Sequence, residues 1–344
     1  MNYSDILVSV IVPVYNREKD LPALVESVLA CKDPRLELLL VNDGSTDGSL
    51  AVCKNLAAED NRVTVINKPN GGVSSARNTG IGSAKGKYLF FCDSDDLVVT
   101  ETLASALELA EAHSEDLLIF DFQYYFLNNG TTKKSSFVLP PEHTFRKDDI
   151  VSLLLEPLVT REATDLAGVW HKLFRTRTLN ATGIRFEEKV ARGEDWRFIV
   201  DFFDAAETAF YTPKILYTYR LDGSQVPSKY ARKPGLHQLG SIDRKLSLIE
   251  KYDLPFSEDR KLRLYHSYLV EIAYAARNNC PRYELREMMR AQRVQIAVKA
   301  LRALSRKQKD EIGFFRREGL FSFCVRYKLA LLSRIVAKKL YKEV

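Results

Sequence analysis

The chain has 344 residues, 46% hydrophobic and 28% charged, which is ordinary for a globular protein large enough for one or two domains. It shows no apolar run of about 18 residues that could span a membrane, no basic start typical of a secretory signal and no CxxC pair among its 5 cysteines, so we predict a cytoplasmic protein with reduced cysteines. The net charge of +6 is uneven, because residues 281–344 hold 17 Lys and Arg against 6 Asp and Glu, and a basic partner-binding surface would therefore lie at the C-terminus.

Strands and helices alternate over roughly the first 110 residues. Apolar runs predict strands at residues 7–16, 36–41, 63–66 and 88–91. Helices are expected to follow them, starting at Asp20, at Thr46 or Asp47, after Gly72 and past Thr100. The Asp20 side chain can cap the first of these helices. This alternation predicts an α/β protein with a doubly wound, mostly parallel sheet.

Three carboxylates follow the fourth strand directly. The run Tyr88–Phe91 is continuously apolar, as in a strand buried on both faces, and Asp93, Asp95 and Asp96 come just after it. Open α/β sheets bind ligands at this end of their strands. Carboxylates this close repel one another unless a cation compensates them, and Mg²⁺ is commonly held by one or two carboxylates plus substrate phosphates. The alternative is an acidic, solvated turn.

Polar or glycine-rich loops also follow the other three strands. They contain Asn16, Asp43-Gly44-Ser45 and Asn70-Gly71-Gly72. Each loop alone is explained as a turn. Together they would meet at one sheet edge, where a nucleotide can bind. The chain has no GxGxxG after its first strand and no GxxxxGK[ST], so the dinucleotide and P-loop signatures are missing.

Four motifs in this order resemble those of family-2 glycosyltransferases. They are VSVIVPVYN at 8–16, VNDGSTD at 41–47, NGGVSSARNTG at 70–80 and DSDD at 93–96. The resemblance implies the A-type nucleotide-diphospho-sugar transferase fold and an inverting transfer from a nucleotide-sugar, here a UDP-sugar.

The resemblance also implies a donor site. Asp43 would accept from the base N3–H, Arg77 would face the base or the phosphates, and Asp93 the ribose. Asp93 and Asp95 would hold Mn²⁺ or Mg²⁺, with a water-mediated contact from Asp96. The full set of expected nucleotide-sugar-binding residues is Pro13, Tyr15, Asn16, Asn42, Asp43, Gly44, Asn70, Gly72, Arg77, Asp93 and Ser94.

The second half of the catalytic region begins near residue 116. We predict a strand at 117–126, an extra ribbon within 121–140, a helix at 147–155 and two short strands within 207–221. The segment Trp170-His171-Lys172 resembles one that family members carry before their acceptor site, commonly with Asn at the position of His171. We therefore predict acceptor contacts here, although Trp170 could equally be a core residue and a lone histidine is often structural.

Glu194 and Asp195 stand at the start of a predicted helix that continues through Phe203. Acidic residues in a first turn interact favourably with the helix dipole, so capping alone could explain them. Family members place a Glu-Asp pair here with its Asp as catalytic base. The resemblance thus implies Asp195 as the base, with Glu194 as the alternative or as a neighbour that orients the acceptor.

The predicted catalytic domain spans 1–225, with a nucleotide-sugar half at about 1–115 and an acceptor half at 116–225. A basic, helical region follows at 226–344. Residues 314–344 are predicted to form a basic amphipathic helix, which could rest on an anionic membrane or pack on the protein itself or on a second copy. The resemblance implies bacterial surface-polysaccharide synthesis, with a lipid-linked oligosaccharide as acceptor at the inner face of the plasma membrane.

Three other functions compete with this interpretation. An aspartate-nucleophile phosphatase also has Asp-x-Asp after a strand, but near its first strand. A sugar nucleotidyltransferase would carry a glycine-rich basic loop after the first strand, which residues 13–19 do not provide. A non-catalytic basic-tailed protein could bind membrane or nucleic acid, but the sequence contains no nucleic-acid module, so we expect no nucleic-acid partner.

Overall fold

The computed structural model describes residues 6–135, 139–161, 164–188, 190, 193–221 and 236–255, with 258, 260–262, 264, 265, 267, 272 and 295–299. The chain divides into two compact units, residues 1–227 and 228–344. The predicted helix at 314–344 lies outside the described residues.

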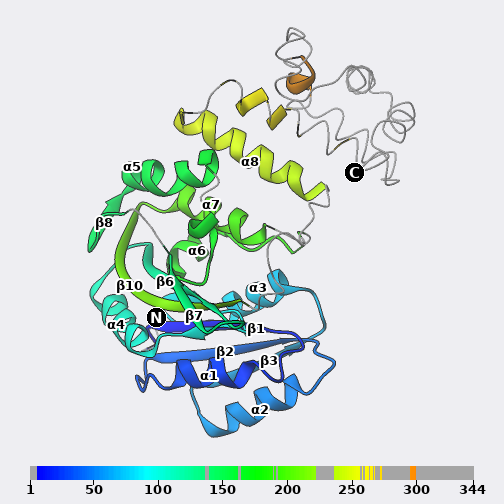
Figure 1. Cartoon of the computed structure of the whole chain (residues 1–344), viewed down its shortest axis with the longest axis vertical. Helices are drawn as coiled ribbons and strands as arrows, with labels where there is room; N and C mark the ends of the chain where they lie inside the picture. The colour runs from blue at the N-terminus through cyan, green and yellow to red at the C-terminus, as the bar shows by residue number, and fades with distance from the viewer. Residues whose placement is uncertain are drawn as a thin grey trace. The chain divides into compact units, whose positions relative to one another are not determined.

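The first unit is a β-sheet with helices against both faces (Figure 1). Its strands are β1 (Val8–Val14), β2 (Leu36–Asp43), β3 (Val63–Lys68), β4 (Tyr88–Phe91), β5 (Leu97–Val98), β6 (Leu117–Phe126), β7 (Thr131–Lys134), β8 (His143–Arg146), β9 (Lys172–Arg175) and β10 (Thr208–Leu221). Its helices are α1 (Leu21–Leu29), α2 (Ser49–Glu59), α3 (Val73–Ser83), α4 (Thr100–Ala112), α5 (Lys147–Asp149), α6 (Thr176–Thr182) and α7 (Glu194–Ala205). Shorter π and 3₁₀ segments are η1 (Ile150–Leu155), η2 (Pro157–Arg161) and η3 (Thr164–Ala167).

The strand order is β3-β2-β1-β4-β9-β6-β10-β5, with β7 beside β6 and β8 beside β10. The pairs β3–β2, β2–β1 and β1–β4 are parallel, which confirms the predicted first half of the sheet. The chain moves outward from β1 to β3 and then returns to place β4 on the other side of β1. Such a switch point opens a crevice at the carboxyl ends of the two central strands.

Two parts of the second half differ from prediction. The segment 172–175 forms β9, a strand antiparallel to both β4 and β6, in the middle of the sheet. Residues 208–221 form one strand rather than two, because register shifts around Ile215 absorb Pro213 and Lys214 into an irregular stretch. A proline cannot donate to a strand ladder, so a bulge is where it is tolerated. The ribbon of β6 and β7 is as predicted.

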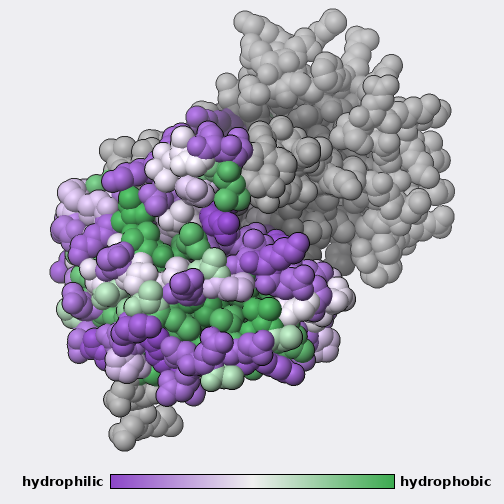
Figure 2. Space-filling model, turned by 60° about the horizontal axis from the view of Figure 1, so that its bottom comes forward, coloured by the Kyte–Doolittle hydropathy of each residue, from purple (hydrophilic) through white to green (hydrophobic). Residues whose placement is uncertain are grey.

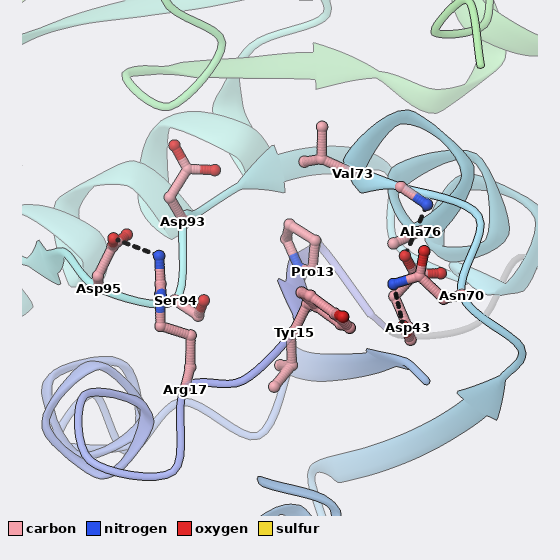
Figure 3. A pocket seen from close by; sticks show the side chains of 12 residues that line it. Pro13, Tyr15, Arg17, Asp43, Asn70, Val73, Ala76, Asp93, Ser94 and Asp95 are labelled. Carbon is pink, nitrogen blue, oxygen red and sulfur yellow. Dashed lines mark hydrogen bonds and ion pairs between the residues drawn. The ribbon is translucent and has the colours of Figure 1, made fainter. Parts of the chain in front are cut away.

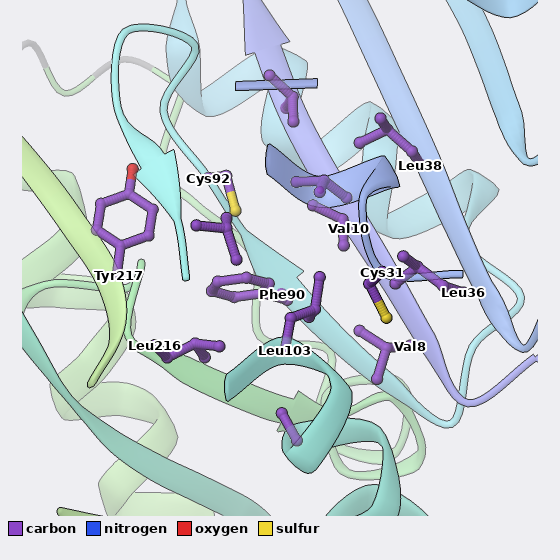
Figure 4. Close-up of a cluster of buried hydrophobic side chains, with 14 of the residues drawn as sticks. Val8, Val10, Cys31, Leu36, Leu38, Phe90, Cys92, Leu103, Leu216 and Tyr217 are labelled. Atoms are coloured by element: carbon purple, nitrogen blue, oxygen red, sulfur yellow. The ribbon is translucent and has the colours of Figure 1, made fainter. Parts of the chain in front are cut away.

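The sheet has a core on each face. On one face β1 packs against α1 and α4, with Val10, Leu24 and Leu103 in one buried cluster. Val10 and Leu103 are labelled in Figure 4. On the other face α3 approaches so closely that a Cβ on Gly80 would lie 2.3 Å from the Ile11 side chain. Alternate residues of a strand point to opposite faces, so one apolar run supplies both cores.

Two helices differ in detail from those predicted from the sequence. Asp20 precedes α1, but its side chain makes no capping hydrogen bond. The helix predicted at 147–155 is a short α-helix continued by the π-helix η1.

Cys31, Cys53 and Cys92 are buried free thiols, as expected of reduced core cysteines. On the face seen in Figure 2, hydrophobic residues gather in the middle of the coloured surface between hydrophilic ones.

The second unit contains the described helix α8 (Leu236–Tyr252). Ile242, Leu246 and Ile249 are buried and recur at helical spacing, as the sequence predicted. Among the described residues, no helix has the length and apolarity that a membrane crossing requires.

Candidate functional site

A cavity of about 410 Å³ lies at the carboxyl ends of β1, β2 and β4 (Figure 3). This is the crevice created by the switch point of the sheet. Its lining residues come from all of the loops singled out in the sequence: Pro13, Val14, Tyr15, Arg17, Asp43, Asn70, Gly72, Val73, Ala76, Asp93, Ser94 and Asp95.

Asp43 organises one end of the cavity. Its carboxylate accepts hydrogen bonds from the backbone N–H of Gly71 (3.0 Å) and of Gly72 (2.7 Å), and it forms an ion pair with Lys68. The Asn70 side chain donates to the Asp43 carbonyl at 2.9 Å. Gly44 has a φ of +68°, and a Cβ there would lie 2.6 Å from the Asn70 backbone nitrogen, so only glycine fits. The loops after β2 and β3 therefore form one rigid edge.

Two exposed apolar side chains form part of the lining. Tyr15 is 48% exposed and Val73 is 40% exposed, although most large hydrophobic residues of the first unit are buried. The Tyr15 ring thus remains available to a planar ligand. Asn16 holds the loop behind it, with a left-handed φ of 54° and a side-chain oxygen that accepts from the Thr46 N–H at 2.8 Å.

The three aspartates after β4 have different environments. Asp95 lines the cavity and pairs with Arg17 at 3.2 Å, and burial together with the Asp93 charge raises the pKa of Asp95. Asp96 is buried, accepts from the Tyr217 hydroxyl at 2.7 Å and from the Arg220 N–H at 2.7 Å, and has a pKa raised well above its ordinary value by burial. The Tyr217 hydroxyl also accepts from the Asp93 N–H at 3.0 Å. Asp96 and Tyr217 therefore anchor the loop that carries Asp93 and Asp95.

Arg77 connects the cavity to the start of α7. Its guanidinium donates to Asp93 Oδ1 at 2.8 Å and to Asp195 Oδ1 at 2.6 Å, and its side chain is only 3% exposed. The Asp195 side chain is 25% exposed. Burial raises the pKa of Asp195 to about 6; Arg77 opposes this rise, whereas Glu194 and Asp93 add to it. A carboxylate with such a pKa can act as a base near neutral pH.

Comparison with known proteins places this geometry in a family. Residues 9–178 match the family model described as glycosyl transferase family 2. The chain is 30% identical over 267 residues to the uncharacterized glycosyltransferase EpsJ of Bacillus subtilis, an alignment that covers 75% of this chain and 74% of EpsJ. The chain belongs to glycosyltransferase family 2.

Two further comparisons concern how much of a relative this glycosyltransferase spans and which fold it has. It is 27% identical to the glycosyltransferase GlyA of Streptococcus pneumoniae over 307 residues, which span 88% of this chain but only 42% of GlyA. A crystal structure of S. aureus TarS 1-349 with UDP-GlcNAc superposes with a TM-score of 0.60 at 20% identity, covering 98% of this chain and 92% of that one. The latter comparison confirms the A-type fold predicted from the motifs.

Most residues expected to bind the nucleotide-sugar are at the cavity of this glycosyltransferase, but four are not. Asn16 bonds to the Thr46 backbone, and Gly44 packs against the Asn70 backbone. Arg77 donates to Asp93 and does not itself line the cavity. Asn42 is buried and donates to the Asn67 side chain at 2.7 Å, so the structure argues against a direct ligand contact. The water-mediated contact expected of Asp96 is likewise unsupported, because its carboxylate is buried against Tyr217.

The residues predicted to bind the acceptor have a different environment from the one expected. His171 and Lys172 are fully buried, so their side chains have no surface with which to contact an acceptor. Trp170 stacks between Tyr217 and Tyr219, at ring separations of 5.0 and 5.3 Å, as a partly buried core residue. The acceptor contact was predicted from a family resemblance of residues 169–174, of which 172–174 lie in the unpredicted strand β9.

Lys172 is held by three acceptors. Its Nζ contacts the carbonyls of Leu166 (3.0 Å) and Gly168 (2.7 Å) and the His171 Nε2 (2.6 Å). His171 Nδ1 contacts the Phe120 carbonyl at 2.8 Å. Burial lowers the pKa of both groups, and the neutral imidazole can donate to Phe120 while it accepts from Lys172. The pair thus fixes the loop before β9.

We expect Lys172→Met to destabilise the first unit by about 2 kcal/mol or more, because each buried acceptor left unpaired costs about 1–3 kcal/mol. Both tryptophans, Trp170 and Trp196, lie in this unit, so denaturant unfolding followed by tryptophan fluorescence measures it. Lys133→Met, on the exposed strand β7, is the control. Equal midpoints for the two variants would contradict the structural role of Lys172.

Arg17 is a cavity residue that the sequence did not suggest. It directly follows the first motif, and no local signal distinguishes it from a surface arginine, since its pairing with Asp95 spans 78 residues.

A divalent ion can be tested against the side chains present. Asp93 and Asp95 line the cavity, and their side chains are 30% and 40% exposed. Their carboxylates are hard oxygen donors of the kind that Mn²⁺ or Mg²⁺ takes together with phosphate oxygens. Both carboxylates pair with arginines, and the described residues contain no cluster of three or more metal-ligating side chains. The donor set therefore fits an ion that is shared with a bound diphosphate rather than one caged by protein alone.

Proposed function

We propose that this glycosyltransferase moves a sugar from a UDP-sugar to a hydroxyl of a lipid-linked oligosaccharide, with inversion, in bacterial surface-polysaccharide synthesis. The observation that carries the proposal is the pairing of a nucleotide-sized cavity with a carboxylate of raised pKa, Asp195, linked to it through Arg77. The UDP-GlcNAc complex of TarS, a protein of the same fold, supports a uridine donor.

The donor would lie along the cavity. Tyr15 supplies an exposed ring for the base. Asp43 is a cavity residue whose buried carboxylate is bonded to Gly71, Gly72 and Lys68, and it would accept from the base N3–H alongside these donors. The diphosphate would lie toward Asp93 and Asp95, where Arg17 supplies positive charge. Asp93 and Asp95 would hold Mn²⁺ or Mg²⁺, which when bound stabilises charge on the departing diphosphate.

The chemistry that this chain's own residues perform is general-base catalysis. Asp195 would take the proton from the acceptor hydroxyl as its oxygen attacks the anomeric carbon, and the nucleoside diphosphate leaves from the opposite face. One displacement inverts the anomeric centre without a covalent intermediate. Such base catalysis typically contributes about 10²–10⁴ in rate. Glu194, next in the chain, remains the alternative base or a group that orients the acceptor.

The setting of the reaction is part of the proposal. We infer an enzyme on the cytoplasmic side of the plasma membrane, because a lipid-linked acceptor would present its sugar there. The basic segment 314–344 would contact anionic lipids peripherally.

The test is a donor panel of UDP-, GDP-, dTDP- and CMP-sugars, each with and without Mn²⁺, in which nucleotide release is measured. We expect metal-dependent release from one UDP-sugar. No release from any donor, together with no calorimetric binding of UDP in the presence of Mn²⁺, would overturn the proposed donor class.

The raised pKa of Asp195 predicts a pH dependence. Only the ionised carboxylate accepts a proton, so kcat/KM, which reports the pKa values of the free enzyme, should rise with pH through about 6 and reach a plateau above it. At pH 5 about one tenth of the plateau rate should remain. Initial rates at acceptor concentrations well below KM, measured across pH, give this profile, and a kcat/KM that is constant from pH 5 to 7 would contradict it.

A further inference from the structure

We propose that Arg77 is a positioning residue, which holds the Asp195 carboxylate in the orientation needed for proton abstraction and fixes its place relative to the donor. The proposal rests on the proposed function in one respect: it takes Asp195 as the base. It gives Arg77 a role that differs from the contact with base or phosphates implied by the family resemblance.

The bridge joins three distant parts of the chain. Arg77 lies in α3, Asp93 follows β4 and Asp195 lies in the first turn of α7, 118 residues beyond Arg77. Two nitrogens of one guanidinium make the two contacts, Nη1 to Asp195 and Nη2 to Asp93. Because the guanidinium is planar and its donors are fixed in direction, it holds the Asp93 and Asp195 carboxylates at a defined separation.

The Arg77 guanidinium packs against the ring of Phe186. Its central carbon lies 5.1 Å from the centre of the Phe186 ring, and that ring stacks on Phe198 of α7 at 4.0 Å with an interplanar angle of 1°. Asn78, the neighbour of Arg77, accepts from the Phe186 N–H at 2.9 Å and donates to the Phe186 carbonyl at 2.8 Å. Thus α3, the segment at 186 and α7 form one support under Arg77.

The contacts leave one carboxylate oxygen of Asp195 for chemistry. Arg77 binds Oδ1, and within the part of the chain that the structure describes Oδ2 has no hydrogen-bond partner. A carboxylate fixed through one oxygen presents the other in a defined direction, and general-base catalysis requires this kind of alignment. The charges that influence Asp195 are Arg77, Glu194 and Asp93, with Lys172 also interacting with it.

A phosphate-binding role would have a different consequence. An arginine that mainly binds the diphosphate contributes to donor affinity, so its loss weakens UDP binding. An arginine that positions the base contributes to turnover instead, and its loss lowers kcat at saturating donor. The two roles are therefore separable by measurement.

The experiment compares Arg77→Lys and Arg77→Gln with Arg185→Gln. Among the described residues, the Arg185 side chain donates to the backbone carbonyls of Leu179 and Ile184 and to Asn180, and to neither acid. For both Arg77 variants we expect UDP affinity, measured calorimetrically with Mn²⁺, to stay within about threefold, and kcat to fall about 10²-fold. The acidic midpoint of the pH–rate profile should move upward in Arg77→Gln, because a positive charge next to Asp195 is lost, and less in Arg77→Lys. Arg185→Gln should change none of these.

Three results would overturn the proposal: a loss of UDP affinity of tenfold or more, an unchanged kcat, or an acidic midpoint that does not move in Arg77→Gln. If the Arg77 variants do not fold, Asn78→Ala tests the proposal instead. This substitution removes the two hydrogen bonds between the Asn78 side chain and the Phe186 backbone and leaves Arg77 and both acids in place. A kcat lowered about tenfold at unchanged UDP affinity supports the positioning role, and an unchanged kcat overturns it. Failure of the proposed function itself is recognised separately, by an Asp195→Asn enzyme that still transfers sugar.

Discussion

Asp195→Asn should reduce sugar transfer by about 10³-fold or more while leaving the affinity for UDP nearly unchanged. The amide has almost the same shape as the carboxylate but cannot accept a proton, so only the base is lost. Burial disfavours the charged form of Asp195, but the amide also removes one of the two carboxylates that pair with the buried Arg77, so we expect some loss of stability and none of the fold itself. Initial rates at saturating donor, with UDP binding by calorimetry, measure both quantities.

Glu194→Gln is the matched control, since Glu194 is the neighbouring carboxylate and the alternative base. We expect a much smaller loss, of about tenfold or less, if Glu194 only orients the acceptor or adds to the local charge. If instead Glu194→Gln abolishes transfer and Asp195→Asn does not, the two roles must be exchanged. Equal large losses in both variants would show that the acids act as a unit.

Asp95→Ala should lower the Mn²⁺-dependent affinity for UDP by about 100-fold, the equivalent of about 2.7 kcal/mol. The carboxylate is one of two at the cavity that would hold the ion, and its loss also releases Arg17 from its ion pair. Binding of UDP without metal should change little, because Tyr15 and the Asp43 edge are untouched. Calorimetric titrations with and without Mn²⁺ separate the two terms.

Asp20→Ala is the control for this second prediction. Asp20 precedes α1, and its side chain makes no capping hydrogen bond, so the substitution removes a nearby charge without touching the cavity lining. If the Asp95→Ala protein binds UDP with normal Mn²⁺-dependent affinity, Asp95 is not a ligand of the metal.

Membership of the glycosyltransferase family already excludes the phosphatase and nucleotidyltransferase alternatives.

The cavity at the sheet edge could be predicted from the sequence because the residues that form it follow local patterns. Parallel strands carry their loops to one edge, so an apolar run followed by Asp93 and Asp95, or by Asp43, is enough to predict a ligand crevice. The order of the parallel strands and the cavity lined by these residues agree with that expectation.

Residues 169–174 show the limit of such reasoning. Their pattern was interpreted through a resemblance as a surface for the acceptor, but antiparallel pairing with β4 and β6 buries His171 and Lys172 completely. Four residues are too few for periodicity to reveal a strand, and strand pairing depends on partners elsewhere in the chain.

The sequence by itself determined the family, the alternation of strands and helices and the acids at the sheet edge, because each depends on residues that are neighbours in the chain. Only the tertiary structure decided which charges meet. Arg77 and Asp195 are 118 residues apart and Arg17 and Asp95 are 78 apart, and no local pattern encodes either pairing. Such ion pairs form only when packing of the helices on the sheet brings the side chains together, and this packing joins Asp195 through Arg77 to Asp93 at the cavity.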